Sequence, residues 1–216
     1  MITLQNVTKS YPAGDGRKVV LDNVSAVFPD GTNIGILGRN GTGKSTMIRL
    51  LSGAELPNKG HIKRQGRVSF PMGFGGTFAH RLSARENIVF LARVYGMPIH
   101  QSVEFVQEFA EVGHYFDMPM HTYSSGMRAR LMFAASLAID FDFYLIDEIT
   151  EVGDSRFREK AVMAFRERIR KSSIILVSHN YHTMRDICQV GAILGNGRLD
   201  FYRSLEEAIT VYETMP

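Results

Sequence analysis

The sequence predicts an α/β protein with a mixed sheet core, an N-terminal antiparallel β subdomain and an inserted α-helical subdomain. Two N-terminal segments, ITLQNVTKSY and KVVLDNVSAVF, alternate apolar and polar residues, as half-buried antiparallel strands do. Three short apolar runs, NIGILG, FDFYLID and SSIILVS, are typical of buried parallel strands. Between the first and second of these runs, apolar residues recur at helical spacing, which predicts that helices interrupt the sheet.

Turn residues separate the predicted elements. AGDGR forms a turn between the first two strands, and NIGILG leads through a glycine-rich turn into a helix that begins near Lys44. GHIKRQGRVSF predicts two more strands, whereas LSARENIVFLARVYG and HQSVEFVQEFAEVGHYF each predict a helix. VGAILGNGRLDFY predicts a hairpin with an Asn-Gly turn, and SLEEAITVYETM an amphipathic terminal helix. We therefore expect a single domain over residues 1–216, with the helical subdomain inserted at approximately residues 80–137.

Composition and charge argue against several classes of protein. The chain has 216 residues, of which 44% are hydrophobic, and a formal net charge of +3 without a polybasic run, so we expect no nucleic-acid partner. The single cysteine, Cys188, cannot form an internal disulfide and is expected to be a buried thiol in a reducing compartment. The N-terminus lacks a signal-peptide pattern, and no apolar run reaches the ~18 residues that cross a bilayer. Any work at a membrane is therefore expected to proceed through a partner.

The motif GRNGTGKS directly follows the strand NIGILG and precedes a helix, and it matches G-x-x-x-x-G-K-[ST]. In such a loop, glycines let the backbone wrap around phosphates so that N–H groups donate to their oxygens. Lys44 is then expected to reach the β- and γ-phosphates, and Ser45 to hold Mg²⁺. A chance glycine-rich turn is the alternative. The predicted nucleotide-binding residues here are Gly38, Arg39, Asn40, Gly41, Thr42, Gly43, Lys44, Ser45 and Thr46.

Polar residues follow two of the apolar strands. FDFYLIDE delivers Asp147 and Glu148 to the carboxyl end of a strand, where α/β sheets bind ligands. We expect Asp147 to position the Mg²⁺ shell and Glu148 to polarise the attacking water, the alternative being an acidic helix cap. SSIILVSHN places His179 after another strand, where it either contacts a γ-phosphate or is a structural histidine.

The segment YSSGMRARL begins with two serines and a glycine before a basic helix. Such a start offers backbone N–H groups and the positive end of the helix dipole to an anion, and no acidic side chain nearby takes that place. The alternative is a helix N-cap without a ligand.

The order of these motifs resembles the nucleotide-binding subunits of ABC transporters, over nearly the whole chain. In that family the signature segment, usually LSGGQ, caps the γ-phosphate of ATP bound by a second copy of the subunit. The resemblance implies that Ser124, Ser125 and Gly126 contact ATP held by the loop of a partner in an ATP-dependent homodimer. It further implies that Tyr11 stacks on adenine, although this tyrosine could equally be a core residue. The catalytic residues implied are Lys44, Glu148 and His179, and the metal-binding residues Ser45 and Asp147.

Several positions depart from the family pattern. Met127 stands where the signature has Gln, and Ser125 where it has Gly. Ala79, followed by His80, occupies the place of a glutamine that contacts Mg²⁺ in the family. How this loop relays the nucleotide state is therefore an open question. Asp154 in EVGDSRF takes the place of a dimer-bridging aspartate, or is a helix cap.

Four segments, YSSGMRARL, YPAGDGRK, FPMGFGGTF and VEFVQEFAEVGHYFDMPMHTYSSGM, resemble the ATPases of bacterial capsular polysaccharide exporters. This resemblance implies a peripheral ATPase on the cytoplasmic face of the inner membrane, docked on a polytopic permease that itself handles the polysaccharide. Related ATPases export O-antigen or teichoic acid, and some O-antigen relatives carry a C-terminal carbohydrate-binding domain; the chain stops at Pro216, which favours capsule export. A soluble ABC ATPase without a transport role is the remaining alternative, but such proteins usually carry a coiled coil or two linked cassettes.

Overall fold

The computed structural model describes residues 1–14, 16–72, 78–147 and 155–215. The chain divides into two compact units, of which the first comprises Met1–Pro71, Phe141–Glu148 and Lys171–Pro216 and the second Met72–Asp140 and Ile149–Arg170. Both sheets lie in the first unit, and the second is helical. The segment expected to form the helical subdomain, residues 80–137, falls inside the second unit, which also includes the helix α5, Ser155–Ile169.

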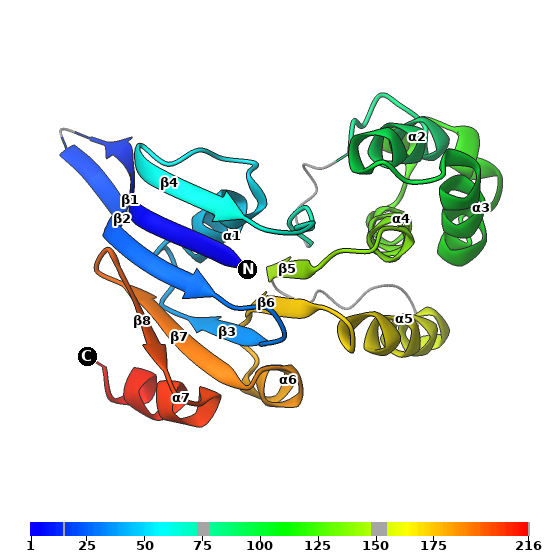
Figure 1. The fold of residues 1–216 in the computed structure, drawn as a ribbon. Helices are drawn as coiled ribbons and strands as arrows, with labels where there is room; N and C mark the ends of the chain where they lie inside the picture. Colours follow the sequence, from blue (N-terminus) through cyan, green and yellow to red (C-terminus); the bar gives the residue numbers. More distant parts are fainter. Residues whose placement is uncertain (15, 73–77, 148–154, 216) are drawn as a thin grey trace. The chain divides into compact units, whose positions relative to one another are not determined.

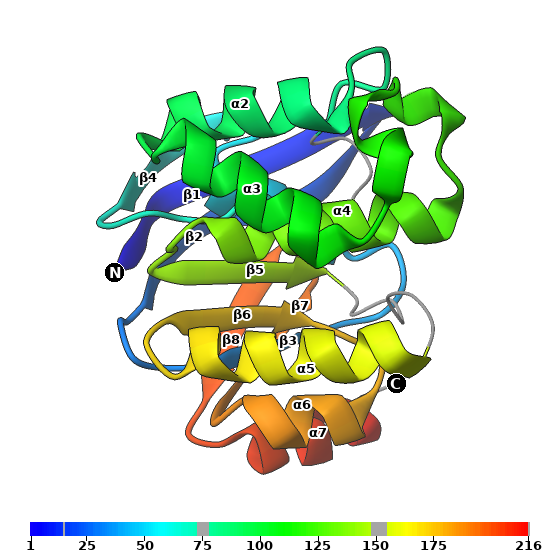
Figure 2. The ribbon, with the colours of Figure 1, turned by 90° about the vertical axis from the view of Figure 1, so that its right-hand side faces the viewer.

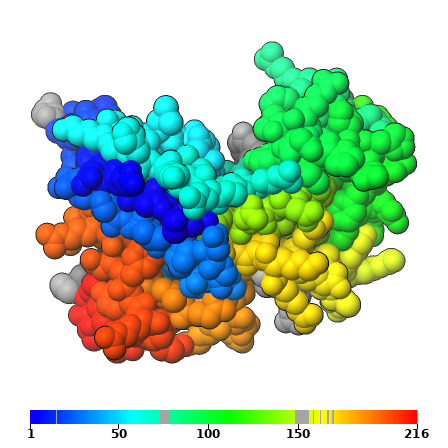
Figure 3. Space-filling view, viewed as in Figure 1, coloured from blue at the N-terminus to red at the C-terminus, as the bar shows by residue number. Residues whose placement is uncertain are grey.

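A three-stranded antiparallel sheet begins the first unit, in the order β2-β1-β4. Its strands are β1 (Ile2–Ala13), β2 (Gly16–Phe28) and β4 (Lys59–Arg64), which run side by side (Figures 1 and 3). Alternating residues such as Ile2 and Leu4 point into the core, while their neighbours face solvent. The predicted antiparallel subdomain is therefore confirmed.

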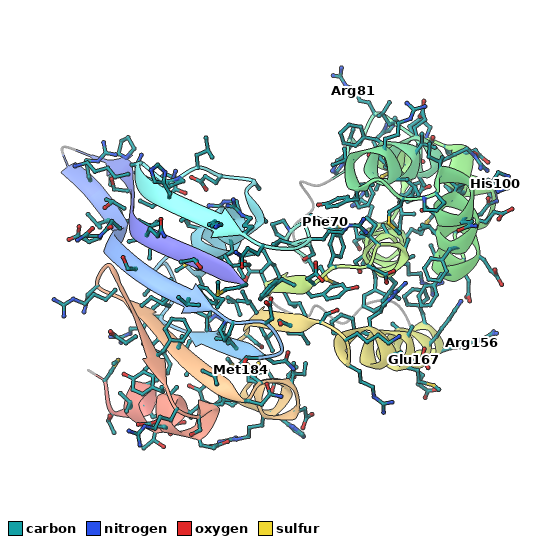
Figure 4. All side chains as sticks on the ribbon, viewed as in Figure 1. Phe70, Arg81, His100, Arg156, Glu167 and Met184 are labelled. Atoms are coloured by element: carbon teal, nitrogen blue, oxygen red, sulfur yellow. The ribbon has the colours of Figure 1, made fainter. Side chains whose placement is uncertain are left out.

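The prediction of a second strand within GHIKRQGRVSF is wrong. After β4 the chain turns at Gly66, whose φ of 96° lies in the left-handed region, and the Arg67 N–H donates to the Asp142 carboxylate at 2.6 Å. Val68 then forms only an isolated parallel bridge with Phe143. The apolar residues that suggested a strand are instead buried by packing. Phe70, labelled in Figure 4, meets the Phe141 ring edge-on with centroids 5.9 Å apart.

The core sheet has five strands in the order β5-β6-β3-β7-β8. These are β3 (Ile34–Leu37), β5 (Phe143–Asp147), β6 (Ser173–Val177), β7 (Val190–Gly195) and β8 (Arg198–Tyr202). The first four in spatial order are parallel, and β8 pairs antiparallel with β7, so the sheet is mixed, as predicted. Every residue of β3 and β6 is buried, which explains their continuous apolar sequences.

The predicted Asn-Gly hairpin joins β7 to β8. Asn196 has φ 50° and Gly197 has φ 78°, the two positive values that a type I′ turn requires. The helices of the first unit are α1 (Lys44–Ser52), α6 (Tyr181–Ile187) and α7 (Leu205–Thr214), and α7 packs against β7 and β3. The start of α1 and the terminal helix are therefore confirmed.

In the second unit, four helices pack around aromatic side chains. They are α2 (Ala84–Tyr95), α3 (Ile99–Ala110), α4 (Ser125–Ala138) and α5, and Figure 2 shows α2 to α4 packed side by side. The Phe109 ring of α3 lies 5.6 Å from that of Phe105, 6.3 Å from Phe133 of α4 and 5.8 Å from Phe157 of α5. Single 3₁₀ turns occupy Gly113–Asp117 and Met120–Thr122.

The helix predicted from HQSVEFVQEFAEVGHYF is shorter than expected. It ends at Ala110, because Glu111 (φ 52°) and Gly113 (φ 57°) both adopt left-handed backbone conformations. The sequence patterns predict neither α5 nor α6. In α5 many charged residues interrupt the apolar pattern, and α6 has only 7 residues, too few for a helical period to be visible. Across the described ranges, no helix combines the length and the apolar character needed to cross a lipid bilayer.

At Gly60, strand β4 lies close to the backbone of β1, where the pairing register shifts between Gln5 and Thr8. Replacement of this glycine should therefore destabilise the fold. Its φ is 79°, and a Cβ there would lie 2.2 Å from the Asn6 carbonyl oxygen. Gly60→Ala should therefore lower the free energy of unfolding by about 2 to 4 kcal/mol, from left-handed strain plus displaced backbone. Gly14→Ala is the matched control, because Gly14 also has a positive φ of 56° but nothing within 4 Å of an added Cβ. In urea unfolding, the control should lose only about 1 kcal/mol of its free energy of unfolding. Equal losses in the two variants would refute the close approach of the two strands at Gly60.

Candidate nucleotide-binding site

The segment Gly38–Gly43 connects the end of β3 to the start of α1, as the motif predicts. The loop is folded on itself, because the Thr42 N–H and the Thr42 hydroxyl both donate to the Arg39 carbonyl, at 3.2 and 2.9 Å. Gly43 has φ 106°, and a Cβ on it would lie 2.1 Å from Cγ1 of Val20. Strand β2 therefore packs directly on the loop, and only glycine fits at this position.

Lys44 lies at the centre of this loop. Its ammonium donates to the Gly38 carbonyl at 2.6 Å and to the Arg39 carbonyl at 3.1 Å, and the residue is 8% exposed. The helix α1 starts without a side-chain cap and without an acidic residue in its first turn. Its N-terminus therefore presents backbone N–H groups and positive dipole next to a lysine, an arrangement that suits phosphate.

The polar residues after β5 and β6 lie at the same edge of the core sheet. Asp147 pairs in register with Val177, and Val177 also pairs with Ile36 of β3, so the carboxyl ends of the three strands meet beside the loop. His179 is exposed between β6 and α6. Glu148, like Asp154, lies outside the described residues.

The donor set fits a magnesium nucleotide. The Ser45 hydroxyl follows the loop lysine in α1, and the half-buried Asp147 carboxylate ends a strand at the same sheet edge. Both are hard oxygen donors, and Mg²⁺ is commonly held by one or two protein oxygens together with the phosphates of its nucleotide.

Tyr11 belongs to a half-buried polar network beside α1. Its hydroxyl donates to Glu55 Oε1 at 2.5 Å and lies 3.4 Å from Thr46 Oγ1. Glu55 also forms ion pairs with Lys9 at 2.7 Å and with Arg49 at 3.0 Å. The Lys9 ammonium lies 5.1 Å from the centroid of the Tyr11 ring and is itself only 7% exposed. The network holds the ring next to Thr46, the last residue of the predicted phosphate-binding segment.

The charge of Glu55 depends on these partners. Burial raises the pKa of its carboxyl, but hydrogen bonds from Lys9, Tyr11 and Arg49 outweigh burial and lower that pKa from 4.5 to about 2. Sequence reasoning missed Glu55 and Lys9. They are far apart in the chain, and no local pattern indicates that they meet.

The YSSGM segment lies in the second unit, at the start of α4. Ser124 is the N-cap of the helix, and its Oγ accepts the Met127 N–H at 3.2 Å. Arg128 donates to the Tyr123 carbonyl at 2.7 Å, which further fixes the turn. Ser124 and Ser125 are exposed, and α4 has no acidic residue in its first turn. Ser124 is therefore an N-cap of α4, and the exposed serines leave the N-terminus of this helix open to solvent.

The segment with Ala79 and His80 is anchored within the second unit. The Asn87 amide of α2 accepts the Ala79 N–H at 2.8 Å and donates to the Ala79 carbonyl at 3.1 Å. The His121 N–H donates to the His80 carbonyl at 2.9 Å. Asn87 is 3% exposed, and its role was missed because a single asparagine within a helical pattern carries no signal of its own.

The strand, loop and helix from Ile34 to Ser52, set in a mixed sheet, define a P-loop nucleoside triphosphatase. The profile of the ABC transporter family matches residues 21–151. The polysialic acid transport ATP-binding protein KpsT of Escherichia coli is 44% identical over 216 residues, which cover 99% of each chain. The capsule polysaccharide export ATP-binding protein CtrD of Neisseria meningitidis is 43% identical, and the match covers 100% of each chain. This chain belongs to the ABC transporter family and is an ATP-binding ABC ATPase.

A solved structure agrees with this assignment at the level of the fold. The dimeric structure of an ATP-binding cassette in a post-hydrolysis state, bound to ADP and Pi, superimposes with a TM-score of 0.76. The superposition covers 95% of this chain and 99% of that chain, at 22% sequence identity.

The Tyr11 network makes a pH-dependent contribution to stability. Glu55→Gln should lower the free energy of unfolding at pH 7 by about 1 to 2 kcal/mol, because it removes a charge shared by two cations. Since the native pKa lies below the unfolded value, the carboxylate stabilises the fold fully above pH 4.5, and its contribution is lost as the pH falls towards about 2.

Urea unfolding of both proteins at several pH values should show their difference shrinking below pH 4.5. Glu108→Gln, at an exposed carboxylate of α3, is the control and should match the parent throughout. A difference that does not vary with pH would contradict an ionised Glu55.

Proposed function

We propose that this protein is the ATPase subunit that powers export of a capsular polysaccharide through a polytopic membrane permease. The observation that carries the proposal is identity above 40%, over the full length of both chains, with ATP-binding proteins named for polysialic acid transport and for capsule export. The polysaccharide is then handled by the permease, and this subunit is peripheral, on the cytoplasmic face of the inner membrane.

ATP binds in the first unit, with adenine on Tyr11 and the phosphates in the segment Gly38–Thr46. For this, the Lys44 ammonium exchanges the Gly38 and Arg39 carbonyls for oxygens of the β- and γ-phosphates. Ser45 and Asp147 hold Mg²⁺, which neutralises charge on the phosphates when bound. The Gly43 contact with Val20 keeps the loop in place during this exchange.

Hydrolysis requires a base and a γ-phosphate contact. Glu148 polarises the attacking water, and His179, exposed after β6, contacts the γ-phosphate. Both follow strands that end at the edge where the phosphate-binding loop lies, which supports their assignment.

The signature segment serves a second copy of the chain. Ser124, Ser125 and Gly126 present the N-terminus of α4, and the anion that this turn suits is the γ-phosphate held by the partner's loop. ATP thereby joins two subunits head to tail, and its hydrolysis removes the joining phosphate and lets them separate. The structurally similar cassette is named as dimeric, which supports the dimer of this proposal.

Lys44→Ala tests the ATPase assignment. Loss of a charge-assisted contact to the phosphates should lower ATP turnover by about 100-fold or more. Lys63→Ala, which removes an exposed lysine from β4, is the control and should retain the parent rate. Turnover is measured with purified protein, and export by surface polysaccharide in a capsule-deficient strain that carries each variant. Near-parental turnover in Lys44→Ala would refute the role of the loop, and turnover without restored export would refute the proposed substrate.

Glu148→Gln tests the dimer. This variant should retain ATP and accumulate as a dimer in ATP and Mg²⁺, because the amide cannot accept the proton of water. Adding Ser125→Arg should abolish the dimer by filling the phosphate position of the signature turn. Gln101→Arg, which adds the same charge at an exposed position on α3, should leave the dimer intact. Light scattering that shows the same mass in all three proteins would contradict the trans contact.

A further inference from the structure

Strand β2 runs along the phosphate-binding loop and presents alternate side chains to it. Val20, which is 2% exposed, packs on Gly43. Two residues earlier, the Lys18 ammonium lies 3.3 Å from the position that a Cβ on Gly41 would occupy. Because residues two apart in a strand point to the same face, the buried Val20 fixes the direction of Lys18. The lysine therefore lies over the loop as a consequence of the strand geometry.

Lys18 is also the cross-strand partner of Tyr11. The two residues are paired in the β1–β2 register, and directly opposite side chains of an antiparallel pair share a face, with Cβ atoms ~5 Å apart. Tyr11 reaches from this face to Thr46 at the start of α1, and Lys18 reaches to Gly41 in the middle of the loop. One cross-strand pair thus borders both the adenine position and the phosphate positions of the proposed nucleotide site.

The two lysines near the loop differ in their surroundings. Lys44 is buried and donates to the loop carbonyls of Gly38 and Arg39. Lys18 is exposed and approaches Gly41 from the strand. Gly41 itself is exposed, with φ 80°, a left-handed conformation that belongs to the backbone of a phosphate-binding turn. A phosphate chain in this loop would therefore have a cation on each side.

We propose that Lys18 is a second cation for the nucleotide, pairing with the phosphates beyond the α-phosphate on the outer side of Gly41. This rests on the proposed binding of ATP to the loop. The contact strengthens binding of nucleoside di- and triphosphates and adds little for monophosphates, because Lys18 lies at the middle of the loop and the base is on Tyr11. Charge-assisted contacts of this kind change affinity by about tenfold.

The test is calorimetric titration of the full chain with ATP, ADP and AMP. Lys18→Ala should weaken ATP and ADP binding about tenfold and AMP binding less than twofold, and Lys18→Arg should keep the parent affinities. Arg17→Ala is the matched control: the guanidinium belongs to the neighbouring residue of β2 and donates to Ser10 Oγ at 2.9 Å on the adjacent strand. This control should bind all three nucleotides like the parent.

Two results would overturn the inference while leaving the proposed function intact. One is parental affinity for ATP in Lys18→Ala. The other is an equal loss for AMP and ATP, which would indicate altered hairpin packing rather than a phosphate contact. If the parent protein binds none of the three nucleotides, the proposed function fails together with the inference.

Discussion

The contact between Val20 and Gly43 is the constraint on which the candidate site depends. It holds an antiparallel strand against the loop Gly38–Gly43 at a point where even a methyl group on the loop would overlap the valine. The loop therefore cannot change its distance from β2 without breaking core packing. The register between β1 and β2 then determines where Tyr11 and Lys18 lie relative to the loop. One buried contact in this way positions a ring and a cation that are distant from the loop in sequence.

The second constraint is the parallel pairing of the core strands. Because β3, β5 and β6 pair in register, the residues that follow them emerge at one edge. Asp147 is held there by strand pairing, with no loop of its own to position it. The site thus combines groups fixed by two different sheets, one antiparallel and one parallel, within a single compact unit.

The sequence predicted the parts of the site that depend on local order. A strand, a glycine-rich turn and a helix are neighbours in the chain, so GRNGTGKS revealed the loop and the start of α1 at Lys44. Period-two and continuous apolar patterns likewise predicted both sheets. The predictions that were wrong or missing concern residues whose structure is determined by tertiary contacts. Arg67 leaves the strand direction because Asp142, 75 residues later, accepts its N–H, and Glu55 joins Tyr11 from 44 residues away. Neither partner can be inferred from its own neighbourhood.

The hydrogen bonds of Lys44 to the Gly38 and Arg39 carbonyls bear on how the loop distinguishes between ligands. A phosphate that enters must compete with two acceptors already built into the chain. The free energy that Lys44 contributes to phosphate binding is then the difference between its contacts to the phosphate and its contacts to the two carbonyls, and not the full strength of the phosphate contacts. A singly charged anion gains little binding free energy from this exchange, because the carbonyl oxygens accept hydrogen bonds from the ammonium nearly as well. In the proposed site, the backbone of the loop would therefore compete with the ligand for Lys44, so that only an anion of sufficient charge would displace it, and it would also keep the lysine ordered in advance.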